Sequence, residues 1–227
     1  MTKSEIRSFV KGLVRGISVE ERTRFSEALK EEVVGLECWR SAKEVMLFFS
    51  LPDEVDMLPL IRAALAEQKR IYLPRVIATK VSRDVDVCEV AEGNTLPKKS
   101  TLAMGSTLPM ESTLPAGNTV SCEEMILEVR ELAPGQLALG RWGIWEPTDE
   151  APLLRDYSRL DLVVVPGLAF SSDGKRLGRG KSFYDRFLPL VPRAAFVGVC
   201  YPCQVVEQIP ADPWDIGMDI VCCGKKR

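Results

Sequence analysis

The stretch Asp161–Arg186 constrains the fold more than any other part of the chain, because it joins an apolar run to a basic, glycine-rich loop. The run, Leu162–Val165, is rich in β-branched residues and is short enough for a strand that is buried on both faces of a sheet. Pro166 and Gly167 then end the strand. The stretch therefore predicts a buried central strand whose exit leads directly into a polar loop.

The loop after this strand has the composition of an anion-binding site. Its glycines and basic residues are Gly174, Lys175, Arg176, Gly178, Arg179, Gly180 and Lys181. Glycines allow the backbone to approach a ligand, and exposed amide N–H groups beside Arg and Lys side chains bind anions. Asp185, which follows, is a candidate ligand for the metal ion that accompanies a polyphosphate. We therefore predict a phosphate-binding loop; the alternative is a basic surface turn without a ligand.

Two common nucleotide-binding patterns do not fit this loop. The GxxxxGK[ST] pattern needs glycine at the position of Lys175, and a GxGxxG pattern that begins at Gly178 needs glycine at the position of Phe183. Local spacing thus supports neither a P-loop nucleotidase nor a dinucleotide-binding enzyme.

The order of strands and helices predicts a parallel sheet. Apolar runs predict strands at Val45–Phe49 and Ile71–Leu73, the second ended by Pro74, with a helix over about residues 58–68 between them. A strand, a helix and a strand in this order form a right-handed parallel crossover. We expect one α/β domain over residues 1–227 with three layers, in which helices cover both faces of a mostly parallel, Rossmann-like central sheet.

Phe49 and Glu54 follow the first of these strands, and ligands in open parallel sheets bind beyond the carboxyl ends of the strands. For Glu54 the alternative is an acid that the macrodipole of the next helix favours at its amino end. Later patterns predict further elements, which are a strand at 125–131, a helix at 183–190 and strands at 196–200 and 220–222.

The chain is expected to begin with two helices, each opened by a capping box: Thr2 with Glu5, and Ser18 with Glu21. The apolar residues of the first recur every three or four positions and are Ile6, Phe9, Val10, Leu13, Val14 and Ile17. Its basic residues are Lys3, Arg7, Lys11 and Arg15, which follow one face. From the residues alone, this face is a solvated basic stripe.

The composition excludes several kinds of chemistry. The chain has no histidine, which excludes Ser-His-Asp and Cys-His catalysis and His-ligated zinc. A formal net charge of −2 gives no reason to expect nucleic acid or a membrane as partner. With neither a signal peptide nor a long apolar run, we expect a cytoplasmic protein. Cys200 and Cys203 have CxxC spacing, and we interpret them as buried thiols rather than a redox or metal pair.

Residues 93–120 differ in kind from the rest of the chain. A short Thr-Leu-Pro unit recurs there, and Pro, Ser, Thr and Gly dominate without a helical or strand period. This composition predicts a flexible, low-complexity insertion within the single domain.

The segments PGLAF and RLGRGKSFYDRFL resemble the signature of the 5-formyltetrahydrofolate cyclo-ligases, also called 5,10-methenyltetrahydrofolate synthetases, whose pattern is close to PGxAFxxxGxRLGxGxGYYDRFL. The chain departs from it at Ser182, where the family usually has glycine, and at Phe183, where it usually has tyrosine. Phe183 keeps an aromatic face but lacks the hydroxyl. The amino-terminal pair Lys3 and Arg7 matches the family's K-x-x-x-R.

The resemblance implies an enzyme that cyclises 5-formyltetrahydrofolate to 5,10-methenyltetrahydrofolate with ATP and Mg²⁺, through an N5-iminium phosphate, releasing ADP and phosphate. The residues it implies for ATP are Lys3, Arg7, Arg176, Leu177, Gly178, Arg179, Gly180, Lys181, Ser182, Phe183 and Tyr184. Those it implies for catalysis are Arg179, Lys181 and Tyr184. Those it implies for the folate are Phe49, Glu54, Phe183 and Trp142, with Trp145 as the alternative to Trp142. Those it implies for the metal are Asp185 and Asp215.

Two other functions remain open at this point. One is a catalytically idle protein that binds folate or nucleotide. The departures at Ser182 and Phe183 keep it in consideration, as does Met57, which stands where the family usually has threonine. The other is a sugar-phosphate enzyme on a similar sheet. We expect small-molecule substrates and a monomer or weak dimer.

Overall fold

A computed structural model describes residues 1–84, 119–140 and 143–225. It consists of two compact units, one formed by Met1–Ile77 with Leu127–Arg227 and the other by Ala78–Ile126. The predicted insertion at 93–120 lies outside the described residues, except that Thr119 and Val120 belong to a strand. Within the described ranges, no helix has the length and apolar character needed to cross a membrane.

The helices in chain order are α1 (Lys3–Arg15), α2 (Val19–Val34), α3 (Glu37–Ser41), α4 (Leu58–Ala66), η1 (Tyr157–Arg159), α6 (Phe183–Phe187), η2 (Leu188–Leu190) and η3 (Pro202–Gln204). The strands are β1 (Glu44–Met46), β2 (Arg70–Asp84), β3 (Thr119–Glu131), β4 (Leu137–Leu139), β5 (Trp145–Pro147), β6 (Leu162–Pro166), β7 (Ala169–Ser171), β8 (Arg176–Leu177), β9 (Ala195–Val199), β10 (Val205–Val206) and β11 (Ile220–Cys222).

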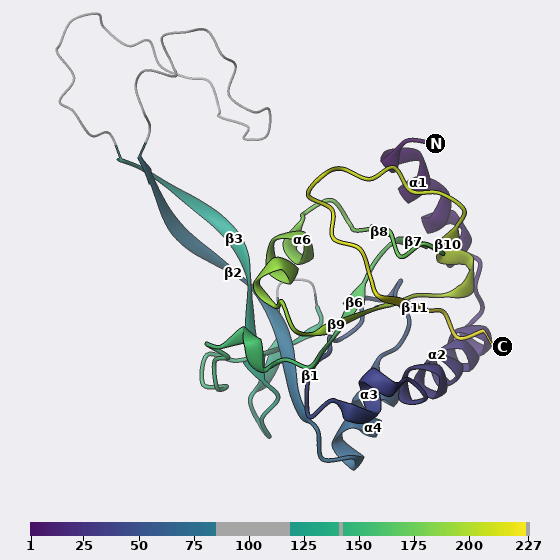
Figure 1. Cartoon of the computed structure of the whole chain (residues 1–227), viewed down its shortest axis with the longest axis horizontal. Helices are drawn as coiled ribbons and strands as arrows, with labels where there is room; N and C mark the ends of the chain where they lie inside the picture. Colours follow the sequence, from purple (N-terminus) through teal and green to yellow (C-terminus); the bar gives the residue numbers. More distant parts are fainter. Residues whose placement is uncertain (85–118, 141–142, 226–227) are drawn as a thin grey trace, which may run out of the picture. The chain divides into compact units, whose positions relative to one another are not determined.

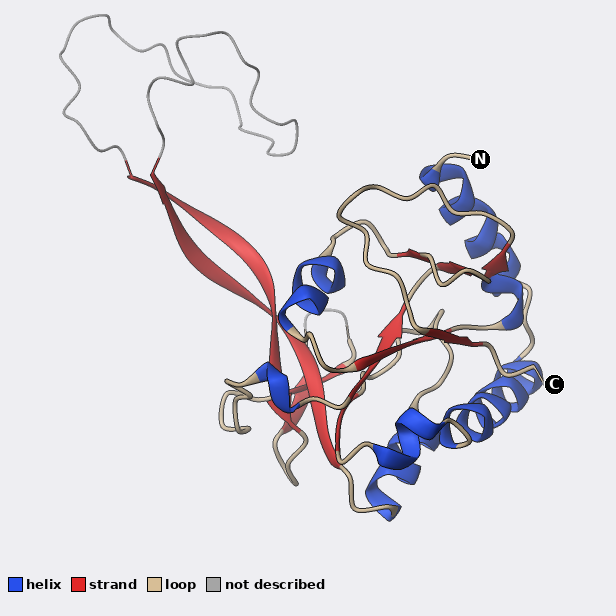
Figure 2. Ribbon diagram, in the orientation of Figure 1, coloured by secondary structure: helices blue, strands red, loops and turns tan. Residues whose placement is uncertain are grey.

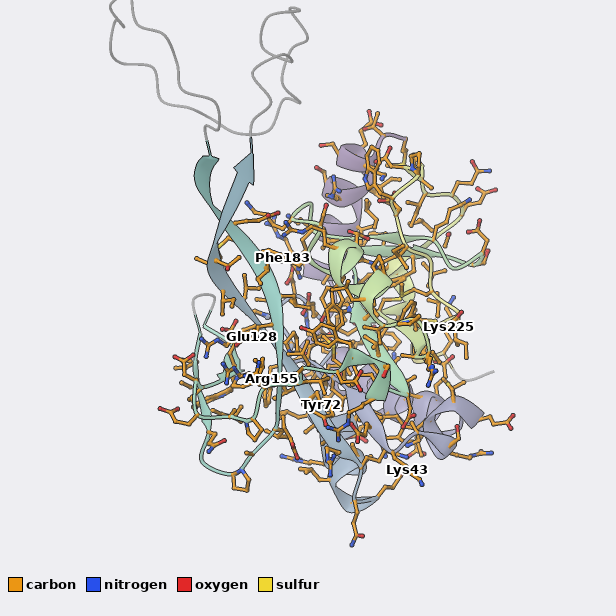
Figure 3. The ribbon with its side chains drawn as sticks, turned by 60° about the vertical axis from the view of Figure 1, so that its left-hand side comes forward. Lys43, Tyr72, Glu128, Arg155, Phe183 and Lys225 are labelled. Carbon is orange, nitrogen blue, oxygen red and sulfur yellow. The ribbon has the colours of Figure 1, made fainter. Side chains whose placement is uncertain are left out.

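The central sheet has six strands in the order β11-β9-β6-β1-β2-β3 (Figures 1 and 2). β6 lies between β1 and β9, and the pairs β1–β2, β1–β6, β6–β9 and β9–β11 are all parallel. In Figure 3, the labels Lys43 and Tyr72 mark the residue before β1 and the paired part of β2. The predictions of a mostly parallel sheet and of Leu162–Val165 as its buried central strand are confirmed.

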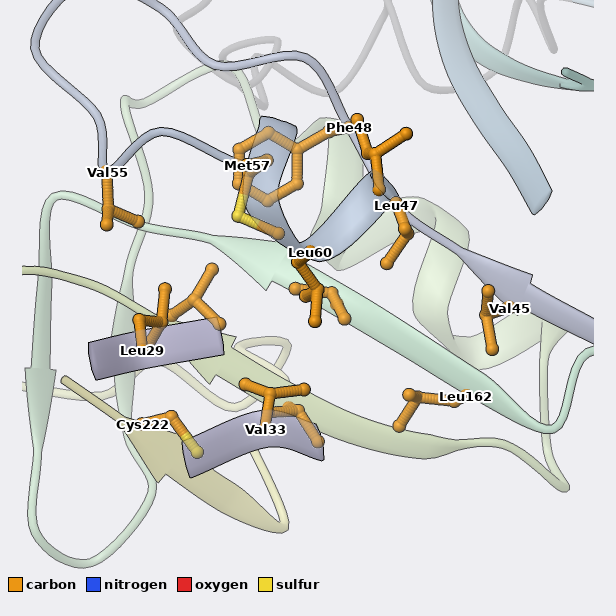
Figure 4. Packing of buried hydrophobic residues seen from close by; sticks show 14 of the residues in the cluster. Leu29, Val33, Val45, Leu47, Phe48, Val55, Met57, Leu60, Leu162 and Cys222 are labelled. Atoms are coloured by element: carbon orange, nitrogen blue, oxygen red, sulfur yellow. The ribbon is translucent and has the colours of Figure 1, made fainter. Parts of the chain in front are cut away.

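Both faces of the sheet are covered, since the first four residues of β6, whose side chains point alternately to opposite faces, are all buried. Leu162 and Val164 of β6 belong to one core cluster with Leu29 and Val33 of α2 (Figure 4). The side chains between them face the opposite way, and Val163 belongs to a second cluster with residues of α6 and η2. The three-layer arrangement predicted from the sequence is therefore confirmed.

The first two helices begin as predicted. Thr2 and Glu5 form a capping box before α1, and Ser18 and Glu21 form another before α2. Of the six apolar residues of the first helical pattern, α1 buries Ile6, Val10 and Val14, whereas Phe9 and Leu13 are 53% and 40% exposed. A helix that packs along one line of i, i+4 and i+8 positions leaves the flanking apolar residues open to solvent.

Pro74 does not end the second strand, which corrects the prediction for Ile71–Leu73: β2 continues to Asp84. The reason is the side to which the proline points. Backbone groups of Arg70 and Tyr72 bond toward the β1 side, to Lys43 O and from Leu47 N, whereas Ile71 O accepts from Leu132 N on the β3 side. Pro74 therefore faces the β1 side beyond the end of β1, where a missing N–H removes no ladder bond.

Cys200 and Cys203 are not joined by a disulfide. Cys200 is buried and Cys203 is half-buried, and burial raises the pKa of both thiols. Both are therefore protonated thiols at neutral pH, which agrees with their interpretation as packing residues.

Candidate functional site

A cavity of about 470 Å³ lies at the carboxyl ends of β1 and β6, within the first unit. Its wall combines the segment that follows β1, the exit of β6 at Pro166 and Gly167, and the loop that leads into α6. The residues predicted for the site that line it are Phe49, Glu54, Arg176, Gly178, Arg179, Lys181, Ser182, Phe183, Tyr184 and Asp185. The fold thus brings together two segments that are more than a hundred residues apart in the sequence.

The glycine-rich loop is shaped by residues with left-handed backbone angles. Gly174 has φ +83°, and a Cβ atom there would lie 2.4 Å from the backbone oxygen of Met218. Ser182 has φ +53° immediately before α6, and this conformation costs a residue with a side chain roughly 1–2 kcal/mol. The positive φ gives a physical reason for the glycine that the cyclo-ligase pattern usually has at this position.

Arg176 holds the loop to the end of β6. Its guanidinium is buried, forms an ion pair with Asp185 at 2.5 Å and donates from Nη1 to the backbone oxygen of Pro166 at 3.3 Å. It also lies over the ring of Tyr184, 5.7 Å from the centroid. Its Nε is buried and has no hydrogen-bond partner among the described residues.

Arg179 reaches across the cavity to two acids on the segment after β1. Its Nη2 lies 2.6 Å from Asp53 Oδ1 and 3.0 Å from Glu54 Oε1, and its Nη1 donates to Asp53 Oδ2 at 3.2 Å. Burial raises the pKa of the Glu54 carboxyl, which the charge of Arg179 only partly offsets. Burial opposes the charge of the Arg179 guanidinium, but its two acid partners raise its pKa overall.

Lys181 and Tyr184 complete the polar part of the wall. Lys181 is exposed, and its ammonium has no ion-pair or hydrogen-bond partner among the described residues. Tyr184 is half-buried, and burial raises the pKa of its phenol. At neutral pH, Tyr184 is therefore a hydrogen-bond donor and not a general base, whereas Lys181 is a cation available to a ligand.

Neither amino-terminal cation lines the cavity, and Arg7 contacts the loop. Lys3 forms ion pairs with Asp212, at 2.7 Å, and with Asp215. Arg7 donates from Nε to the backbone oxygen of Gly178 at 3.0 Å. Neither Lys3 nor Arg7 lines the cavity, and nor do Leu177, Gly180 and Asp215.

Outside the cavity wall, Leu177 belongs to the hydrophobic core and Gly180 lies beside Arg7. The side chain of Leu177 is buried in the hydrophobic core, so any ligand contact would have to come from its backbone. Gly180 has φ +94°, and a Cβ atom there would lie 3.9 Å from the guanidinium of Arg7. Arg7 and the loop are therefore close neighbours, as a shared anion site requires.

The two acids predicted to bind a metal each form an ion pair with a basic side chain. Asp185 lines the cavity and is paired with Arg176, whereas Asp215 is paired with Lys3. Burial alone would raise the pKa of the Asp215 carboxyl, but the hydrogen bond from Lys3 lowers it overall. The charge of Arg176 contributes to this lowering. In the described part of the chain, no three Cys, Asp or Glu side chains are grouped to hold a metal ion. A metal bound at either carboxylate would therefore have to compete with its basic partner and take its other ligands from substrate phosphates and water.

Aromatic and aliphatic side chains form the rest of the wall. Phe49 and Trp145 line it together with Phe183, which begins α6 and is labelled in Figure 3. Trp145 is 49% exposed, so one face is open to a ligand. Trp142, the other tryptophan predicted for the folate, lies outside the described residues.

Some lining residues were not singled out in the sequence, namely Phe48, Leu51, Asp53, Pro74, Val76, Leu127, Ile144 and Glu146. Only Asp53 carried a usable signal, since it precedes Glu54 in the loop after a predicted strand. The apolar ones resemble ordinary core residues in sequence. Glu146 is partly buried, which raises the pKa of its carboxyl.

Comparison with known proteins gives consistent results. Residues 1–104 and 99–224 match the model of the 5-formyltetrahydrofolate cyclo-ligase family. A 5-formyltetrahydrofolate cyclo-ligase of Haemophilus influenzae is 24% identical over 98% of this chain and 97% of its own length, and one of Mus musculus is 26% identical over 96% and 92%. The solved structure of Aquifex aeolicus 5,10-methenyltetrahydrofolate synthetase is similar with a TM-score of 0.69 and 30% identity, over 100% of this chain and 91% of that one.

Proposed function

Because this chain belongs to the 5-formyltetrahydrofolate cyclo-ligase family, we propose that it uses ATP to convert 5-formyltetrahydrofolate into 5,10-methenyltetrahydrofolate, with release of ADP and phosphate. One observation carries the proposal: a single cavity at the carboxyl ends of the parallel strands has both an aromatic wall and a row of cations. An aromatic wall suits a flat pterin, and the cations suit a triphosphate.

The chemistry needs positioning and charge stabilisation more than a protein nucleophile. A formamide oxygen is a poor leaving group, so the γ-phosphoryl group of ATP is transferred to it, which gives an N5-iminium phosphate. N10 then attacks the activated formyl carbon and loses its proton to water or to the departing phosphate, and the C–O bond breaks as phosphate leaves. A transfer of this kind is catalysed by holding the reactants in line and by neutralising the phosphoryl oxygens. The absence of histidine from the chain is compatible with such a mechanism.

Arg179 and Lys181 are the side chains we assign to the transferred phosphoryl group, with Tyr184 as a neutral donor beside them. Support for Lys181 comes from its position in the cavity wall without a partner among the described residues. Support for Tyr184 comes from the raised pKa of its phenol, which keeps the donor proton in place. These groups stabilise charge as it forms on the phosphoryl oxygens.

The remaining phosphates are assigned to the loop and to α1. Arg176 lines the cavity, and Gly178 and Gly180 would offer backbone N–H groups. Arg7 contacts the same loop and adds positive charge behind it, whereas Lys3 would have to leave Asp212 and Asp215 to meet a phosphate. Asp185 and Asp215 would hold Mg²⁺, which when bound neutralises phosphate charge.

The folate is assigned to the aromatic part of the wall. Phe49, Phe183 and a tryptophan would contact the ring system, and Trp145 is the tryptophan whose position supports this role. Glu54 would accept hydrogen bonds from the pterin, since its carboxylate lies in the cavity and is 9% exposed.

The test is an assay of the purified chain with 5-formyltetrahydrofolate and Mg-ATP, following the ultraviolet absorbance of the methenyl product. We expect an increase in absorbance that requires ATP. No ATP-dependent increase would overturn the proposal. Binding of both ligands without product would indicate a folate- and nucleotide-binding protein instead.

A further inference from the structure

Arg179 forms ion pairs with Asp53 and Glu54, which belong to the segment that we assign to folate binding. Under the proposed function, Arg179 binds phosphate and Glu54 binds folate, yet the two side chains bind each other, with Arg179 Nη2 3.0 Å from Glu54 Oε1. Asp53 has no assigned role so far. Its carboxylate accepts two hydrogen bonds from the same guanidinium, at 2.6 and 3.2 Å. All three side chains line the cavity.

Each of these contacts competes with a ligand contact. A triphosphate that takes the two Nη–H groups of Arg179 that now donate to Asp53 must displace this carboxylate. On the acid side, Glu54 Oε2 already accepts from the backbone N of Leu51 at 3.0 Å, whereas Oε1 accepts from Arg179. A pterin donor at Oε1 therefore weakens the hold of Glu54 on the guanidinium.

We propose that Asp53 is a positioning residue that holds Arg179 against Glu54 until ATP binds, and that release of this clamp links the binding of the two substrates. The inference rests on the proposed function. Folate bound to Glu54 weakens the contact between Glu54 and Arg179. ATP therefore displaces Asp53 from Arg179 more easily when folate is present. Because linkage is reciprocal, ATP strengthens folate binding by the same factor.

The exposure of the pair makes the exchange possible. The side chains of Arg179 and Asp53 are 33% and 40% exposed, so water screens their attraction. Partly exposed ion pairs of this kind change an equilibrium by roughly two- to five-fold. The clamp is therefore strong enough to orient Arg179 and weak enough for a triphosphate to replace it.

The test is calorimetric titration of the full chain with the non-hydrolysable ATP analogue AMP-PNP and Mg²⁺, with and without saturating 5-formyltetrahydrofolate. For Asp53→Asn we expect AMP-PNP to bind roughly two- to five-fold more tightly without folate, and folate to add less affinity than in the wild type. The matched control is Asp173→Asn, which removes the same charge and an ion pair with Lys175 but does not line the cavity. It should keep the wild-type affinity and folate dependence.

The sign of the change separates the clamp from a structural role, since a loosened loop would bind AMP-PNP more weakly. Asp53→Asn binding that equals the wild type or is weaker would overturn the inference, as would a wild-type affinity that folate does not change. Failure of the proposed function looks different: the wild type itself would then bind no AMP-PNP or form no methenyl product.

Discussion

Lys181 separates catalysis from stability more cleanly than any other residue assigned to the phosphates. Its side chain is exposed, lines the cavity and has no partner in the described part of the chain. Lys181→Ala therefore removes no hydrogen bond or ion pair with the described residues, and we expect the free energy of unfolding to change by about 0.5 kcal/mol or less. Loss of a group that stabilises transition-state charge costs about 2.7–4 kcal/mol, which is roughly 10²–10³-fold in kcat.

The matched control is Lys175→Ala. Lys175 belongs to the same basic segment and is paired with Asp173 at 2.7 Å, but it does not line the cavity. We expect this variant to keep the wild-type rate. Initial rates of methenyl product formation and the midpoint of urea unfolding are measured for both variants and the wild type. Full activity of Lys181→Ala, or an equal loss of activity in Lys175→Ala, would refute the assignment of Lys181 to the phosphoryl group.

Three further outcomes follow from the geometry. Gly174→Ala should destabilise the chain by more than Gly135→Ala in urea unfolding, because both glycines have positive φ but only at Gly174 does a Cβ meet backbone within 3 Å; equal losses would contradict the close approach to Met218. Asp185→Ala should lower the free energy of unfolding by about 3–5 kcal/mol, because it leaves Arg176 buried without its partner. The double variant Arg176→Met with Asp185→Leu should recover much of that loss, whereas a loss below about 1 kcal/mol in Asp185→Ala would show that solvent reaches the guanidinium. Burial raises the pKa of Glu54 above its ordinary 4.5, so its protonated form is favoured on folding. The stability of the wild type relative to Glu54→Gln should therefore fall as pH rises above about 4.5; a relative gain would mean that pairing with Arg179 outweighs burial.

The sequence by itself indicated the first two helices and the central strand of the sheet, and it led to the prediction of a phosphate-binding loop. The capping boxes of α1 and α2 and the apolar run of β6 are local signals, since each acts within a few residues of chain. The Ser182 departure from the family pattern was also visible in sequence. Its cost was not, because that cost depends on the φ of +53° that the folded loop imposes.

The tertiary structure alone decided which charges meet. Arg179 and Asp53 are 126 positions apart, and Lys3 and Asp215 are 212 apart, so no local pattern indicates that they pair. The same holds for Pro74, whose tolerance inside β2 depends on where the neighbouring strand stops. Hydrophobic periodicity specifies which face of each element is buried, whereas ion pairs form wherever packing brings opposite charges within a few ångströms.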